Sequence, residues 1–127
     1  MIDLENGDKN ELIYYGNHLY HHDVPILMTD DEILESYKRN KKELEKYTNY
    51  RDLFAFPFGQ PNSCFSENQV DLILNNGATK VFRSSGNINI DSSSSYLDRL
   101  SLTPGQKTPI QIWGNLFKRR IMTCFRS

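Results

Sequence analysis

The chain lacks several features that would define its class at once. No segment approaches 18 consecutive apolar residues, so the sequence predicts no membrane-spanning helix. The two cysteines, Cys64 and Cys124, form no C-x-x-C pair, which excludes a zinc knuckle or a disulfide framework and favours two inert, partly buried thiols. The first eight residues are polar and acidic, unlike a secretory signal, so a cytoplasmic location is expected for the chain as written.

The chain also lacks a large net charge. Its formal net charge of −1 gives no global field that would attract nucleic acid or an anionic membrane, so neither is expected as a partner. Basic residues are concentrated in the last ten positions, where a solvated helix face is the simplest interpretation. With 127 residues, 38% of them hydrophobic and 12% aromatic, the chain has the size and composition of one globular domain.

Short apolar runs alternate with helical patterns along the sequence. The predicted elements, in chain order, are strand 11–15, helix 30–47, strand 53–56, a helix from 66 to 76, strand 80–84, a short strand within 96–102 and a closing amphipathic helix from 108. The segment from 17 to 28 and the four serines at 92–95 are predicted loops. Such alternation indicates the α/β class with a mainly parallel sheet.

Two capping boxes mark where helices begin. Thr29 is followed three residues later by Glu32, and Ser66 is followed at the same spacing by Gln69. In each pair the hydroxyl can accept a hydrogen bond from the later amide, while the later side chain reaches back to the first amide. Gly77 stands where the second helix is expected to end.

Three polar segments follow three of the predicted strands, namely 17–22, 57–62 and 84–89. Parallel α/β folds place their binding sites in the loops after the carboxyl ends of the strands. We therefore expect these segments to form one site.

All three histidines lie in the first of these segments, at His18, His21 and His22. Imidazole is a common ligand of zinc and related ions. The spacing of four between His18 and His22 suits two ligands on one side of a turn, and His18 with His21 is also possible by distance. A polar loop without metal is an equal alternative. A catalytic metal site usually needs a third protein ligand, and the sequence does not mark which carboxylate would serve.

The second strand ends in an aromatic-proline turn, Phe-Ala-Phe-Pro-Phe-Gly, at residues 54–59. Proline stops the ladder after a buried strand, and the glycine permits a conformation that other residues resist. Such a turn can offer a backbone amide to a ligand beside an aromatic wall. The simpler interpretation is a strand end that packs against the core.

Taken in order, these motifs resemble a known family. His18-x-x-x-His22, a capped helix, the 54–59 turn, a helix ending in Asn-Asn-Gly-Ala and the strand Lys-Val-Phe-Arg-Ser are similar to the polysaccharide deacetylase (NodB-homology, carbohydrate esterase family 4) pattern over residues 10–102. That span includes the segment Leu-Asp-Arg-Leu at 97–100, where related chains often carry a similar arginine. The resemblance implies a distorted (β/α) barrel and metal-dependent hydrolysis of an N-acetyl, sometimes O-acetyl, group on a glycan.

The resemblance also implies roles for particular residues. His18 and His22 would bind a divalent metal together with an Asp, with zinc expected and cobalt or nickel possible. Phe56, Pro57 and Phe58 would contact the acetylated glycan substrate. The backbone amide of Phe58 would donate to the developing oxyanion.

The chain departs from the family pattern in three places. Only Asp3 and Asp8 precede His18, and neither stands in the family's Asp-Asp motif, so the metal carboxylate and the general base are not found. Ala55 replaces the arginine of the family's Arg-x-Pro-Tyr motif, and no histidine follows His22 to serve as general acid. We expect a domain that is truncated or split at its front, in preference to a degenerate relative, and a polypeptide that is inactive by itself.

Two functions of other classes remain open. One is a non-catalytic carbohydrate-binding module whose stacking surfaces are the aromatic residues Phe56, Phe58, Tyr20 and Trp113. The other is a protein-interaction domain that docks through the basic C-terminal helix at 103–127. A truncated barrel would also leave an open sheet edge, through which self-association is possible.

Overall fold

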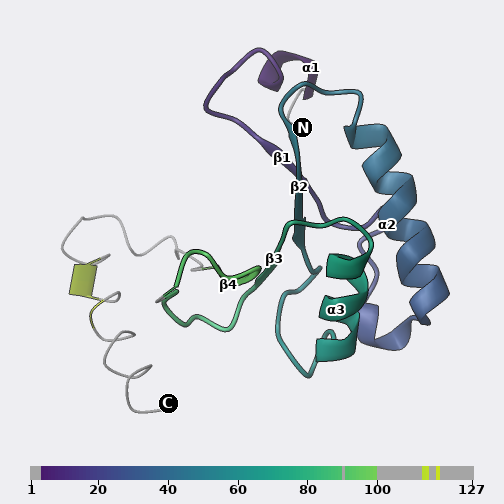
Figure 1. The fold of residues 1–127 in the computed structure, drawn as a ribbon, viewed down its shortest axis with the longest axis vertical. Helices are drawn as coiled ribbons and strands as arrows, with labels where there is room; N and C mark the ends of the chain where they lie inside the picture. Colours follow the sequence, from purple (N-terminus) through teal and green to yellow (C-terminus); the bar gives the residue numbers. More distant parts are fainter. Residues whose placement is uncertain (1–3, 90, 100–112, 115–116, 118–127) are drawn as a thin grey trace.

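The structure is a computed structural model that describes residues 4–89, 91–99, 113–114 and 117 (Figure 1). Its elements in chain order are α1 (Leu4–Gly7), β1 (Tyr15–Asn17), the 3-10 helix η1 (Pro25–Leu27), α2 (Asp30–Leu44), β2 (Tyr50–Ala55), α3 (Glu67–Asn75), β3 (Lys80–Arg83) and β4 (Tyr96–Asp98). No helix in the described ranges is both long enough and apolar enough to cross a membrane.

The four strands form one sheet in the order β1-β2-β3-β4, and every neighbouring pair is parallel. Parallel neighbours need a crossover, which α2 provides between β1 and β2 and α3 provides between β2 and β3. The expected α/β class with parallel strands is therefore confirmed. In the described part of the chain, β1 and β4 are the edge strands.

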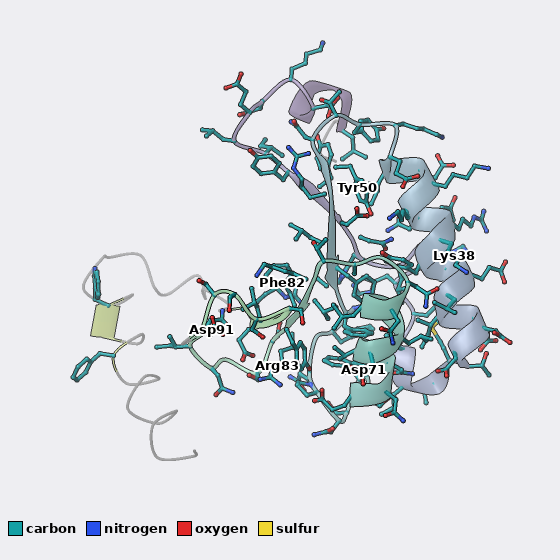
Figure 2. All side chains as sticks on the ribbon, viewed as in Figure 1. Lys38, Tyr50, Asp71, Phe82, Arg83 and Asp91 are labelled. Carbon is teal, nitrogen blue, oxygen red and sulfur yellow. The ribbon has the colours of Figure 1, made fainter. Side chains whose placement is uncertain are left out.

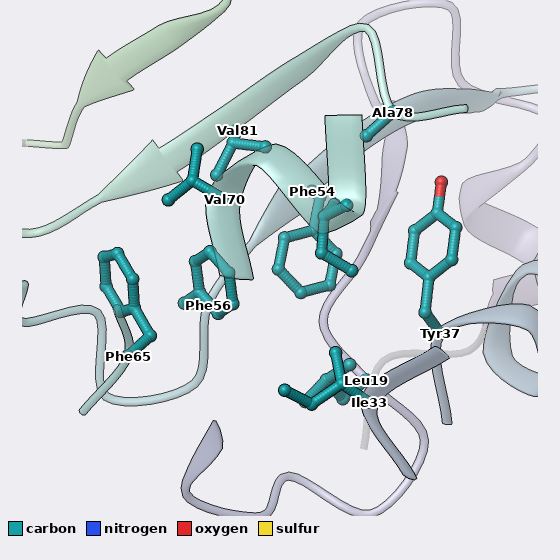
Figure 3. Packing of buried hydrophobic residues seen from close by; sticks show 10 residues of the cluster. Leu19, Ile33, Tyr37, Phe54, Phe56, Phe65, Val70, Ala78 and Val81 are labelled. Carbon is teal, nitrogen blue, oxygen red and sulfur yellow. The ribbon is translucent and has the colours of Figure 1, made fainter. Parts of the chain in front are cut away.

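Helices α2 and α3 lie on the same side of the sheet and contact each other (Figure 1). Between helices and sheet lies the core, whose buried apolar residues are Leu19, Ile33, Tyr37, Phe54, Phe56, Phe65, Val70, Ile73, Ala78 and Val81 (Figure 3). The rings of Phe56 and Phe65 stack with centroids 4.1 Å apart. Phe54 meets Phe56 and Tyr37 edge to face.

Both predicted capping boxes are present. The amide of Thr29 donates to Glu32 Oε2 at 2.8 Å, and the amide of Glu32 donates to Thr29 Oγ1 at 3.4 Å. Ser66 and Gln69 make the same reciprocal pair at the start of α3. Gly77 follows the end of α3 with φ of +108°, as predicted for a helix terminator.

Two predicted boundaries are wrong. The run 11–15 was expected to be a buried strand, but β1 begins only at Tyr15, and Leu12 is 88% exposed. The strand pairs with β2 through Tyr15 and Asn17, with a shift of register between them, and the apolar pattern does not mark Asn17. Helix α2 ends at Leu44 rather than near 47, because Tyr47 lies in the following turn and packs its ring against Tyr15.

The predicted fourth strand is present as β4, and the serines at 92–95 lie between β3 and β4. The predicted C-terminal helix at 103–127 falls outside the described residues apart from Trp113, Gly114 and Phe117. These three positions are helical, and all three are exposed.

Candidate functional site at the carboxyl edge of the sheet

The carboxyl ends of the strands bring the three predicted polar segments together. The loop after β1 reaches the end of β2 through His18, whose Nδ1 lies 2.6 Å from the carbonyl oxygen of Ala55. The turn after β2 contacts the segment after β3, because the amide of Ser84 donates to the carbonyl of Gly59 at 2.5 Å. Both junctions lie at one edge of the parallel sheet, as expected for this fold class.

His18 is held in a defined orientation. Because its Nδ1 faces a carbonyl oxygen, this nitrogen must carry the proton, which leaves the lone pair on Nε2. Partial burial is the largest influence on this ring and lowers the pKa of His18, and the nearby His22 and Arg99 lower it further. These effects outweigh the opposing contribution of the Ala55 carbonyl. His18 is therefore neutral near pH 7, which is the form that binds a metal.

His22, rather than His21, lies against His18. The ring centroids of His18 and His22 are 4.8 Å apart with the planes inclined at 67°. The His22 ring also meets Phe58, at a centroid distance of 4.9 Å. The His21 ring instead contacts Tyr20. Of the two histidine pairings that the sequence allows, the structure brings together the one with a spacing of four.

A buried asparagine positions this loop, and the sequence reasoning missed it. Asn17 is 1% exposed, and its Nδ2 donates to the carbonyl of Tyr37 at 2.8 Å. Its Oδ1 accepts from the amide of Leu19 at 3.0 Å and from Asn40 at 2.9 Å. The amide of Tyr20 donates to Ser36 Oγ at 2.9 Å. The histidine loop is thus tied at its start to α2.

The turn after β2 exposes one aromatic ring and buries another. Phe58 is 54% exposed, while Phe56 and Pro57 are fully buried. This corrects the expectation that the Phe56 ring could stack on a ligand, because Phe65 and Phe54 occupy its surroundings. Pro57 likewise serves the core, so only Phe58 keeps an accessible side chain at the predicted substrate-contacting positions.

The backbone of this turn presents an unused donor. Phe58 and Gly59 have φ of +59° and +71°, and the amide of Gly59 donates to the carbonyl of Pro57 at 2.6 Å. The amide of Phe58 makes no hydrogen bond within the described part of the chain. It therefore has the free donor that the predicted oxyanion role requires.

Backbone strain is concentrated in the two loops that form this site. Within the described ranges, the non-glycine residues with positive φ are Leu19, His22, Phe58 and Asn62. All four belong to the loops after β1 and β2. Such conformations cost of order 1–3 kcal/mol each and persist where the surrounding structure enforces them, which is common at functional sites.

Arg99 completes the site from the segment after β4. Its Nη2 donates to the carbonyl of Phe56 at 3.3 Å, so the guanidinium crosses over the end of β3. A Cβ added at Gly59 would lie only 2.7 Å from this Nη2 and 2.8 Å from Ser84 Oγ. Glycine at 59 therefore allows the close approach of Arg99. The sequence indicated only that the 97–100 segment carries a family-like arginine.

Two imidazoles are the groups at this edge that could bind a metal. The neutral, oriented His18 and the adjacent His22 suit two ligands of a zinc-type ion, and the Ala55 carbonyl is a typical outer partner for a ligating histidine. No group of three or more His, Cys, Asp or Glu side chains suited to a metal occurs among residues 4–89, 91–99, 113–114 and 117. The described residues thus offer two possible metal ligands at this edge and no carboxylate beside them.

A larger hollow lies elsewhere and is not lined by the histidine pair. It has a volume of about 460 Å³ and lies between the 21–28 segment and the first turns of α2. His21, Asp23, Glu32, Glu35 and Arg39 are its ionisable lining residues. A smaller pocket of about 280 Å³ includes His18 and Arg99 in its walls, so it is the one that belongs to the site.

The arrangement of residues at the carboxyl edge is the basis on which a function is proposed for this chain. No protein-family model, no curated protein and no solved structure matches the chain.

Proposed function

We propose that the chain is part of a metal-dependent deacetylase domain of the NodB-homology type, acting on an acetylated glycan. The observation that carries this proposal is the contact between His18 and His22 at the carboxyl edge, with His18 Nδ1 held by the Ala55 carbonyl. The four parallel strands would then be one section of a distorted (β/α) barrel. Coverage of a single sheet face by α2 and α3 is consistent with that architecture.

In this proposal each residue has a separate task. His18 and His22 would hold the divalent ion, zinc by preference, and the Ala55 carbonyl would orient His18. The ion would supply polarisation of the acetyl carbonyl and a lowered pKa for bound water. The free amide of Phe58 would donate to the oxyanion, and the exposed Phe58 ring would contact the sugar.

A general base is the missing part of this proposal. Proton removal from the attacking water needs a positioned carboxylate or equivalent group. No acidic side chain joins the two imidazoles in the described part of the chain. We therefore expect the isolated polypeptide to bind metal but to hydrolyse acetylated oligosaccharides slowly or not at all.

Zinc titration of the wild type and three single variants tests the proposal. His18→Ala and His22→Ala each remove one ligand, so zinc affinity should fall by more than about tenfold, at least the loss usual for outer-shell partners. His21→Ala is the matched control, because His21 lies in the same loop with its ring on Tyr20. Equal affinities in the wild type and in a His18→Ala/His22→Ala double variant would remove the metal hypothesis.

Glycan binding without hydrolysis is the second candidate, and the exposure of Phe58 favours it. In that case the wild type would bind an N-acetylated oligosaccharide in the presence of a chelator. Phe58→Ala would abolish this binding, while His18→Ala would leave it unchanged. Zinc-dependent glycan binding would instead support the deacetylase.

A further inference from the structure

Arg99 is partly buried at the site, and no acidic side chain among the described residues pairs with it. Its Nε is buried and makes no hydrogen bond within the described residues, and its Nη2 has only the long bond to the Phe56 carbonyl. The neighbouring Asp98 is already engaged, because it accepts hydrogen bonds from Arg83 Nε at 3.1 Å and from the amide of Ser85 at 3.2 Å. A guanidinium with an unused buried donor is unfavourable until an acceptor meets it.

The other arginines in the described ranges all have partners of the usual kinds. Arg83 forms a salt bridge with Asp98 and lies over the ring of Tyr96. Arg39 lies over Tyr20, and Arg51 lies over Tyr14. Among the described residues, Arg99 meets neither a carboxylate nor an aromatic ring, although it is more enclosed than the exposed Arg39 and Arg51. This contrast singles out Arg99 as a group placed to receive a ligand.

The pocket beside Arg99 limits what that ligand can be. Its volume is about 280 Å³, and His18 and Arg99 are its ionisable side chains. The remaining lining residues are Gly16, Asn17, Leu53, Phe54, Ala55 and Phe82. Because Phe54 and Val81 face the helices, alternation along the strands turns Leu53, Ala55 and Phe82 to the opposite face. The pocket therefore combines one permanent positive charge with largely apolar walls, on the face of the sheet opposite α2 and α3.

We propose that Arg99 is a carboxylate-binding residue, which pairs its guanidinium with a carboxylate placed in this pocket beside His18. Carboxylates match the fork of guanidinium donors better than spherical anions do. The apolar walls suit the hydrocarbon part of a short carboxylic acid or of an Asp or Glu side chain. The catalytic meaning of this contact rests on the proposed deacetylase function, whereas carboxylate binding itself requires no metal.

Titration of the isotope-labelled full chain with acetate tests this binding directly. The Arg99 Nε–Hε resonance and the amide of Phe82 are followed by NMR, with chelator present and ionic strength held constant with chloride. We expect a saturable shift of both signals that chloride alone does not produce. An absent shift, or one that is linear and equal to the effect of chloride, would overturn the proposal.

Substitutions at Arg99 distinguish the contribution of the guanidinium hydrogen bonds from that of the positive charge. Arg99→Met should weaken acetate binding by about tenfold or more, because a charge-assisted hydrogen bond is lost, and Arg99→Lys should retain only part of the affinity. Arg51→Met is the matched control, since Arg51 is exposed on Tyr14. Unchanged acetate affinity in a folded Arg99→Met would also overturn the proposal. The wild-type titration remains decisive if that variant does not fold.

A dilution series without acetate distinguishes two sources of the carboxylate, namely a second copy of the chain and a free acid. If a second copy supplies an Asp or Glu side chain, the Arg99 resonance will depend on protein concentration, and acetate will dissociate the dimer in sedimentation velocity. If the natural ligand is a free acid, the resonance will be independent of concentration. Because the chelator is present throughout, a failure to bind zinc leaves these results unaffected.

Discussion

The layer between the helices and the sheet differs sharply from the loops at the carboxyl edge. In the layer, the strand residues Phe54 and Val81 are fully buried against α2 and α3, and both helices begin with complete capping boxes. The edge instead holds four non-glycine residues with positive φ, and two of its donors, the amide of Phe58 and Nε of Arg99, have no hydrogen-bond partner among the described residues. Figure 2 shows the side chains of both regions as sticks on the ribbon.

This contrast indicates that the layer and the carboxyl edge of the sheet have different roles. Apolar burial and satisfied helix ends stabilise the layer, and that stability can hold the edge in conformations it would not adopt alone. The helices of the layer begin with complete caps, whereas the non-glycine residues with positive φ in the described ranges lie in the edge loops, where ligands are expected.

The largest difference should appear between two phenylalanines of the same turn. Phe56→Ala removes a fully buried ring stacked on Phe65, so the free energy of unfolding should fall by about 3–5 kcal/mol. Phe58→Ala removes an exposed ring and should cost less than about 1 kcal/mol. Urea denaturation of both variants measures the two losses. Losses of similar size would contradict the division into layer and edge.

The next largest effect concerns the residue that joins the two regions. Asn17→Ala leaves the buried partners of its side chain unpaired, so the free energy of unfolding should fall by about 2–3 kcal/mol. Zinc affinity should fall as well, because the histidine loop loses its tie to α2. Asn40→Ala removes only one bond to Asn17 and should cost about 1 kcal/mol. A stability loss in Asn17→Ala with unchanged zinc affinity would show that the loop is held by other contacts.

The helix caps should have a smaller effect, confined to the layer. Thr29→Ala and Ser66→Ala each remove a cap and should lower the free energy of unfolding by about 1 kcal/mol. Ser63→Ala serves as the control, because Ser63 is exposed and caps no helix, and its effect should stay within about 0.5 kcal/mol. Thermal or urea unfolding distinguishes these values. Equal losses in all three variants would mean that the caps add nothing specific.

The smallest effect should be a decrease in the free energy of unfolding at alkaline pH, caused by a tyrosine of the layer. Burial and the neighbouring Asp52 raise the pKa of Tyr50 in the folded chain, so its contribution is complete below the ordinary tyrosine pKa of about 10 and is lost as the pH rises above it. Tyr50→Phe should therefore flatten the fall in unfolding free energy above about pH 10. If the unfolding free energy of this variant fell with alkaline pH as steeply as that of the wild type, a group other than Tyr50 would be responsible.

A companion variant tests an unpartnered hydroxyl in the same layer. The hydroxyl of Tyr37 is buried without a hydrogen-bond partner in the described residues. Tyr37→Phe should therefore leave the free energy of unfolding at pH 7 within about 0.5 kcal/mol of the wild type, or raise it slightly. A loss well above this value in urea denaturation would indicate a partner for that hydroxyl.

Much of the fold could be predicted because local signals agree with it. The capping boxes at Thr29 and Ser66 fixed both helix starts, and alternation of strands with helices gave the parallel sheet. The first strand was misplaced because an exposed apolar run precedes it, whereas Gly16 and Asn17 have little strand propensity. Their place in β1 depends on pairing with β2, which no local window contains.

The site could be predicted only in part, for a related reason. The position of the histidines after the first strand was sufficient to expect that they meet the turn after the second strand. The sequence alone could not decide between His21 and His22, because the choice depends on the left-handed backbone at His22. Nor could it show that Phe56 is enclosed, since an alternating aromatic run is compatible with either face of the strand.

By itself, the sequence determined the α/β class, the capped helices and the strand ends where a site would form. These features depend on residues close together in the chain, so local physical rules reach them. Only the tertiary structure decided that Asn17 holds the histidine loop to α2 and that Arg99 reaches the carbonyl of Phe56. Those contacts join segments 20 and 43 residues apart, and they exist only because a parallel sheet brings its carboxyl ends to one edge.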